Sequence, residues 1–96
     1  MRKILFLDED TRINLQKSVN KQLEIKNRLL KLLFENENHK LSSKEVNVLH
    51  NKYQEQIYIL DLIQSNLQLG TNRKVIQDIN RLIDIYNKSD IELVSK

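Results

Sequence analysis

Apolar side chains recur at intervals of three and four residues through most of this chain, and that periodicity constrains the fold more than any other feature. At about 100° per residue, such intervals place side chains on one face of a helix. Between residues 11 and 36 the apolar positions share one arc, and most charged residues occupy the opposite one. The apolar positions are Leu15, Val19, Leu23, Leu29, Leu30, Leu33 and Phe34. We therefore predict an amphipathic helix over residues 11–36, starting from Asp10 or Thr11.

One lysine interrupts the apolar arc of this first helix. Lys26 lies among the apolar positions rather than with the other cations. A lysine can keep its ammonium group in water while its methylene stem covers apolar surface. The sequence therefore predicts that this part of the helix lies near solvent, or that Lys26 extends past the contact to water.

A second helix has a strong start signal. Ser42 is followed three residues later by Glu45, which is the spacing of a capping box, and Leu41 and Val46 occupy the positions of a hydrophobic staple. Apolar residues then lie on two sides of the predicted helix 43–69, so it is expected to be central and to contact two neighbours. On one side, in heptad spacing with an inward Gln56, are Val46, Leu49, Tyr53, Leu60, Ile63 and Leu67; on the other are Val48, Ile59, Leu62 and Leu69.

The end of the chain predicts a third helix over residues 72–88. Gly70 is expected to end the second helix as its C′ residue, and Thr71 or Asn72 to cap the third. The apolar stripe of this helix is Val75, Ile76, Ile79, Leu82, Ile83 and Tyr86. A repeated Ser-x-x-Glu pattern, Ser89 to Glu92, predicts a separate short turn in the tail 89–96.

These elements predict one all-α domain over residues 1–96. The expected architecture is a three-helix antiparallel bundle, or a coiled-coil helical hairpin plus a third helix. Residues 1–10 form an N-terminal arm. Its apolar segment 4–7 is expected either to cover the bundle as a lid or to contact a partner.

The start of the chain also suggests a different fold. An apolar run that ends in Asp8, Glu9 and Asp10 is how a phosphoacceptor receiver domain begins. That fold requires alternating strands and helices, and no buried-strand pattern follows residue 7. We therefore interpret the three acids as favourable negative charge at a helix N-terminus.

Residues for catalysis or cofactor binding are scarce. The chain contains no cysteine, and Gly70 is its only glycine, so no thiolate site or Gly-rich phosphate loop is present. The only histidines, His39 and His50, lack the i, i+4 spacing of a metal pair. No serine stands in a recognisable nucleophile motif. We expect no catalytic, cofactor-binding or metal-binding residues and no enzymatic activity.

Two stretches resemble known families. "LSSKEVNVLHNKYQEQIYIL" resembles the start of the second helix of the helical-hairpin aspartyl-phosphate phosphatases of the sporulation phosphorelay. That family's signature Ser and Asp align with His50 and Gln54, so the resemblance implies the hairpin without the activity. Arg12, Arg28 and Lys40 are similar to the spaced cations of all-helical chorismate mutases, but that family's first helix continues through its lysine, whereas "NENHKLSS" breaks it here.

Charge suggests a partner surface. The net charge is +3 and the sequence pI is about 9.2, with the excess of cations in the first helix. Four of these cations share one face, which is either merely solvated or contacts an anionic partner. No apolar window is long enough for a signal peptide or a membrane span, so a cytoplasmic protein is expected. Abundant Lys, Asn and Ile without Ala suggests a bacterial or phage origin.

The sequence therefore predicts a small non-enzymatic interaction module, a regulator or inhibitor that docks a helical face on another protein. Apolar residues left outside the predicted helix contacts make a homo-oligomer the expectation as well. The candidate contact residues are Lys17, Lys21, Arg28, Lys31, Ile25, Leu32, Ile59 and Leu62. The alternatives are a cytosolic bacteriocin-immunity-type helical bundle and a small basic nucleic-acid-associated regulator.

Overall fold

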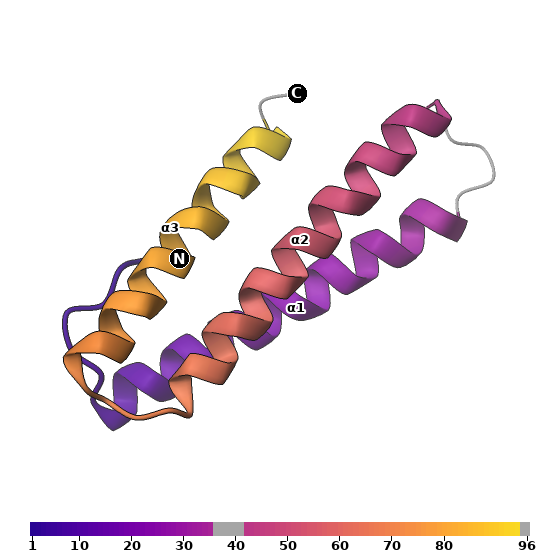
Figure 1. Cartoon of the computed structure of the whole chain (residues 1–96). Coiled ribbons are helices and arrows are strands. Elements are labelled where there is room, and N and C mark those ends of the chain that lie inside the picture. Colours follow the sequence, from indigo (N-terminus) through magenta and orange to yellow (C-terminus); the bar gives the residue numbers. More distant parts are fainter. Residues whose placement is uncertain (36–41, 95–96) are drawn as a thin grey trace.

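The computed structural model describes residues 1–35 and 42–94, and all regular structure in them is helical. The order is α1 (Glu9–Glu35), α2 (Ser43–Leu67) and α3 (Arg73–Val94). α2 lies between the other two and packs against both (Figure 1). The prediction of an all-α fold with three antiparallel helices and a central second helix is confirmed.

α1 begins earlier than predicted because its cap is Asp8. The Asp8 carboxylate accepts the backbone N–H of Thr11 at 2.8 Å, and the Arg12 N–H donates to the Asp8 carbonyl at 2.9 Å. Hydrogen bonds from Thr11, first from its side chain and then from its backbone, lower the pKa of Asp8. The predicted start at Asp10 or Thr11 is wrong, since the helix starts at Glu9 and leaves a shorter arm.

α2 begins where the capping box placed it. Ser42 has extended backbone angles and its hydroxyl accepts the Glu45 N–H at 3.2 Å, while Glu45 Oε1 accepts the Ser42 hydroxyl at 3.3 Å. The staple partner Leu41 lies outside the described residues. At the other end, α2 stops at Leu67 with Gln68 as its C-cap, two residues before the predicted end. Gly70 follows with a φ of 138°, a value that L-residues rarely adopt.

α3 starts as predicted but extends further. Asn72 caps it by accepting the Val75 N–H at 2.9 Å. The helix then continues to Val94, so the predicted end at residue 88 and the separate turn over 89–96 are wrong. Ser89 is buried inside the helix, where its side chain cannot serve as an N-cap. Asp90, two residues past the predicted end, accepts hydrogen bonds from Lys26 of α1 and Gln56 of α2, so contacts with both helices continue beyond residue 88.

The core gathers apolar side chains from all three helices and the arm. On α2 both predicted apolar sides contribute, because Leu60 and Ile63 are fully buried and Ile59 is nearly so. The heptad position Gln56 is also fully buried, as predicted. The buried apolar residues are Ile4, Leu7, Leu15, Val19, Ile59, Leu60, Ile63, Leu67, Val75, Ile79, Ile83 and Tyr86.

The N-terminal arm is a lid on the bundle. It runs antiparallel to α3, with Ile4 and Leu7 buried in the core. Asn80 Oδ1 accepts the Ile4 N–H at 2.8 Å and Asn80 Nδ2 donates to the Ile4 carbonyl at 2.7 Å. Asn87, one heptad later, makes the same pair of bonds with the Met1 amino group and carbonyl at 2.9 and 2.8 Å. Two asparagines thereby hold the arm's backbone.

The spacing of these two asparagines requires an extended arm. Seven helical residues rise by about 10.5 Å, and three extended residues span about 10 Å. The arm therefore advances from Asn87 to Asn80 only in an extended conformation. Leu5 and Phe6, between the two buried anchors, point outward and are 92% and 61% exposed.

A substitution at the centre of the core tests this packing. Leu60→Ala is expected to lower the free energy of unfolding by about 2–5 kcal/mol, because Leu60 is fully buried and the vacated space cannot close completely. Leu32→Ala, the control at an exposed position of α1, is expected to change it by no more than about 0.5 kcal/mol. Urea unfolding followed by far-UV circular dichroism measures both. Equal effects would contradict the core assignment.

Candidate functional site

The predicted basic stripe lies on one solvent-exposed face of α1. The face runs the length of the helix and points away from α2. We call it the outer α1 face; it comprises Ile13, Lys17, Lys21, Ile25, Arg28, Lys31 and Leu32, all exposed. Its apolar side chains are interspersed with its cations, so the face is amphipathic. A surface that contacts only water does not require exposed apolar side chains.

Two of the four cations of this face form ion pairs within α1, and the other two do not. Arg28 contacts Glu24 at 3.7 Å and Lys31 contacts Glu35 at 3.9 Å, both through exposed side chains one helical turn apart. Such exposed pairs contribute little to stability and exchange readily for other partners. Among the described residues, Lys17 and Lys21 form no ion pair. The face therefore offers its positive charge to solvent or to a partner.

The two α2 candidates do not join this face. Ile59 is only 6% exposed and contributes to the core, so its assignment as a partner contact is wrong. On this second predicted apolar side of α2, Ile59 is buried in the core, whereas Val48 is half-buried and Leu69 is exposed. Leu62, one turn later, is half-buried at the edge of the same helix pair.

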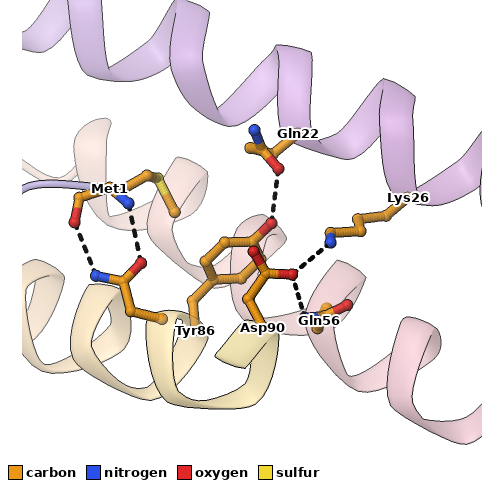
Figure 2. Close-up of polar contacts among 7 residues, drawn as sticks. Met1, Gln22, Lys26, Gln56, Tyr86 and Asp90 are labelled. Carbon is orange, nitrogen blue, oxygen red and sulfur yellow. Dashed lines mark hydrogen bonds and ion pairs between the residues drawn. The ribbon is translucent and has the colours of Figure 1, made fainter. Parts of the chain in front are cut away.

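Lys26 behaves differently from the sequence-based expectation. Its residue is only 6% exposed, and its ammonium group donates to Asp90 Oδ1 of α3 at 2.7 Å (Figure 2). The lysine thus neither lies near solvent nor extends past the contact to water. Its ammonium group also lies 5.8 Å from the centre of the Tyr86 ring, within the range of a cation–π interaction. The lysine that interrupts the apolar arc is therefore a buried cation paired with a carboxylate that is partly exposed.

Further polar groups surround this pair. Gln56 Nε2 donates to the same Asp90 oxygen at 3.3 Å, and the Tyr86 hydroxyl donates to Gln22 Oε1 at 2.8 Å (Figure 2). Burial, and then the negative charge of Asp90, raise the pKa of Tyr86 above its ordinary value. The cluster therefore joins all three helices through neutral Tyr86 and the charges of Lys26 and Asp90.

A second surface feature lies between α2 and α3. Two hollows of about 220 and 170 Å³ flank the exposed side chain of Ile85. Asn66, Asp78, Arg81 and Leu82 line the larger, and Lys52, Glu55, Lys88 and Ser89 line the smaller. The Ser89 hydroxyl is buried and has no hydrogen-bond partner among the described residues. The sequence analysis missed this face, although the exposed position of Ile85 follows from its place off the predicted α3 stripe.

Two other properties are reported for the described part of the chain. It contains no group of three or more His, Cys, Asp and Glu side chains that could hold a metal ion. None of its helices combines the length and low polarity needed to cross a bilayer.

Comparison with known proteins gives no family for this chain. No protein-family model, no curated protein and no solved structure matches it. The geometry of its surfaces is therefore the basis for the functional proposals below.

The buried ion pair predicts an asymmetric mutational response. Asp90→Asn leaves the Lys26 charge buried without a counter-charge and is expected to lower the free energy of unfolding by about 1–3 kcal/mol. This lies below the usual cost of breaking a buried pair because the Asp90 side chain is 43% exposed. Lys26→Met is expected to be near neutral, and the double variant to be more stable than Asp90→Asn alone. Urea unfolding checks the cycle; additive effects would contradict a coupled pair.

The raised pKa of Tyr86 predicts alkaline destabilisation. An unfolded tyrosine titrates near pH 10.0, whereas folded Tyr86 keeps its proton to higher pH. Its stabilising contribution is therefore complete below about pH 10 and declines above it, because the unfolded chain then releases a proton that the folded chain retains. In Tyr86→Phe the fall in unfolding free energy between pH 9 and 12 is expected to be shallower.

Tyr58→Phe provides the control for this measurement, since Tyr58 is exposed and carries the same phenol. Its pH profile is expected to follow that of the unchanged chain. Urea unfolding at each pH gives the slopes. The same slope for all three chains would show that Tyr86 titrates normally.

Proposed function

We propose that this chain is a small non-enzymatic interaction module that docks its outer α1 face on an acidic, amphipathic surface of another protein, and so regulates or inhibits that protein in the cytoplasm. The observation that carries the proposal is the exposed alternation of Ile13, Ile25 and Leu32 with four cations along one face of α1. A partner helix with carboxylates at i, i+4 spacing and apolar residues between them has the complementary pattern.

Length and exposure support a contact along the whole helix. Ile13 and Leu32 are nineteen residues apart in the chain, which corresponds to about 28 Å along the axis. Ile25 and Leu32 are 38% and 53% exposed, so each still has apolar surface to bury. α1 packs against the rest of the fold through its opposite side, so a partner can cover the outer α1 face without opening the core.

Charge supports a partner of opposite sign over a second copy. The face holds four cations, and the Glu24 and Glu35 carboxylates that pair with two of them reduce the net charge to +2. An antiparallel pair of α1 helices centred between Lys21 and Glu24 would place Lys17 opposite the second copy's Arg28, although Lys21 would stand opposite its Glu24. A parallel pair would place each cation beside its equivalent. Both arrangements bring like charges together, whereas carboxylates of a partner would relieve them.

The test is affinity capture with matched charge variants of the full chain. Lys17→Glu/Lys21→Glu reverses two unpaired cations of the outer α1 face. Arg73→Glu/Lys74→Glu makes the same change in charge at exposed positions of the first turn of α3, where acids suit the helix dipole. A stoichiometric partner that is bound by the unchanged chain and by the α3 variant, and lost by the α1 variant, is expected.

The elution conditions identify the chemistry of the partner. An acidic protein should release gradually with salt and should also be lost when Ile25 and Leu32 are both changed to Asp. Retention of nucleic acid alone, with a steep salt dependence, would contradict the proposal and favour phosphate contacts. A protein retained equally by all variants would place the contact on another surface.

A further inference from the structure

The face between α2 and α3 combines a ridge, two hollows and several charged side chains. Ile85 forms the ridge, and the hollows of about 220 and 170 Å³ lie on either side of it along α3. Ile85 is 43% exposed, and Leu82, which lines the larger hollow with it, is half-buried. Neither Asp78 nor Arg81 forms an ion pair among the described residues.

We propose that this face pairs with the same face of a second copy, so that two α3 helices lie antiparallel about a twofold axis close to residue 83. Together with the two α2 helices they form a four-helix interface. The proposal goes beyond the docking of an outside protein on the outer α1 face and uses a different side of the molecule. It assigns the expected homo-oligomer to a defined surface of the molecule.

The twofold operation brings the ridge of each copy into a hollow of the other. In an antiparallel pair about residue 83, position 85 of one helix stands at the level of position 81 of the other. The second copy's Ile85 therefore faces the larger hollow, beside Arg81 and Leu82. An apolar side chain from one helix inserted between side chains of its neighbour is the usual packing of such interfaces.

The same operation pairs opposite charges. Position 78 of one helix stands at the level of position 88 of the other, so Asp78 of each copy approaches Lys88 of the other. The twofold axis produces this contact twice. Arg81 is long enough to turn toward the second copy's Glu55, which lines the smaller hollow one turn away. Lys88 already contacts Asp84 at 3.5 Å, but both side chains are exposed and this pair exchanges readily. The charge pattern thus complements itself in the antiparallel orientation.

The first test is the solution mass of the full chain by sedimentation equilibrium across a concentration series. A monomer–dimer equilibrium is expected, and Ile85→Asp is expected to weaken the dimer by at least about tenfold, because a charge would replace the central apolar contact. Ile25→Asp makes the same change at a similarly exposed position of the outer α1 face and should leave the dimer intact. A chain that is monomeric at all concentrations overturns the proposal.

A charge exchange tests the orientation without touching the apolar residues. Asp78→Lys and Lys88→Asp are each expected to weaken the dimer, and the double variant to regain most of the affinity, because the pair is reformed with its signs reversed. Far-UV circular dichroism confirms the helical content of each variant. If the dimer persists in Ile85→Asp, or if the double variant is as weak as the sum of the single ones, the copies do not pair through this face.

The two proposals can fail separately. Loss of dimerisation in Ile85→Asp leaves capture by the outer α1 face unchanged, whereas Lys17→Glu/Lys21→Glu removes capture and leaves the dimer.

Discussion

The ion pair between Lys26 and Asp90 joins the two helices whose backbones do not approach each other directly. α2 packs against both neighbours, but in the described part of the chain no Cα of α1 lies within 8 Å of a Cα of α3. Long side chains bridge this separation, through Lys26 to Asp90 and through Tyr86 to Gln22. A buried lysine is costly unless an acceptor stands opposite it. The Lys26–Asp90 and Tyr86–Gln22 bonds therefore connect α3 to α1 directly, in addition to the packing of both helices against α2.

The N-terminal arm closes the other part of the same separation. Ile4 and Leu7 add apolar surface to the core, and Asn80 and Asn87 satisfy backbone groups that burial would otherwise leave without partners. The asparagine bonds involve only the arm's backbone, so the identity of the arm's residues matters mainly at the two buried anchors. A small chain gains a larger core this way without a fourth helix.

The interior contacts determine which surfaces remain for partners. α1 presents its inner arc to α2 and α3, so its outer face stays free along its whole length. α3 presents one arc to the arm and the core, and the ridge of Ile85 stays on the side toward α2. The proposed docking face and the proposed self-pairing face therefore lie on different helices, and a dimer can bind a partner protein on each copy.

The sequence by itself determined the number of helices, the starts of α2 and α3 and the side of each helix that faces inward. Caps such as Ser42 and Asn72 act within three or four residues of their own position, and apolar periodicity is a property of a single helix, so both are legible in the chain. The exposure of the four α1 cations followed from the same periodicity. The prediction that Gln56 faces inward is confirmed, because its heptad position lies on the same side of the helix as the buried apolar residues.

Only the tertiary structure decided which polar residues are interior and which apolar residues are free. Lys26 has its acceptor 64 residues away, at a position that no local pattern connects with it. Ile59 is buried because α3 covers it, and α3 continues past residue 88 because Ser89 and Asp90 face its neighbours. These outcomes depend on which helices meet and at what level along their axes. Packing fixes that relation across the whole chain, whereas caps and periodicity report only on their own segment.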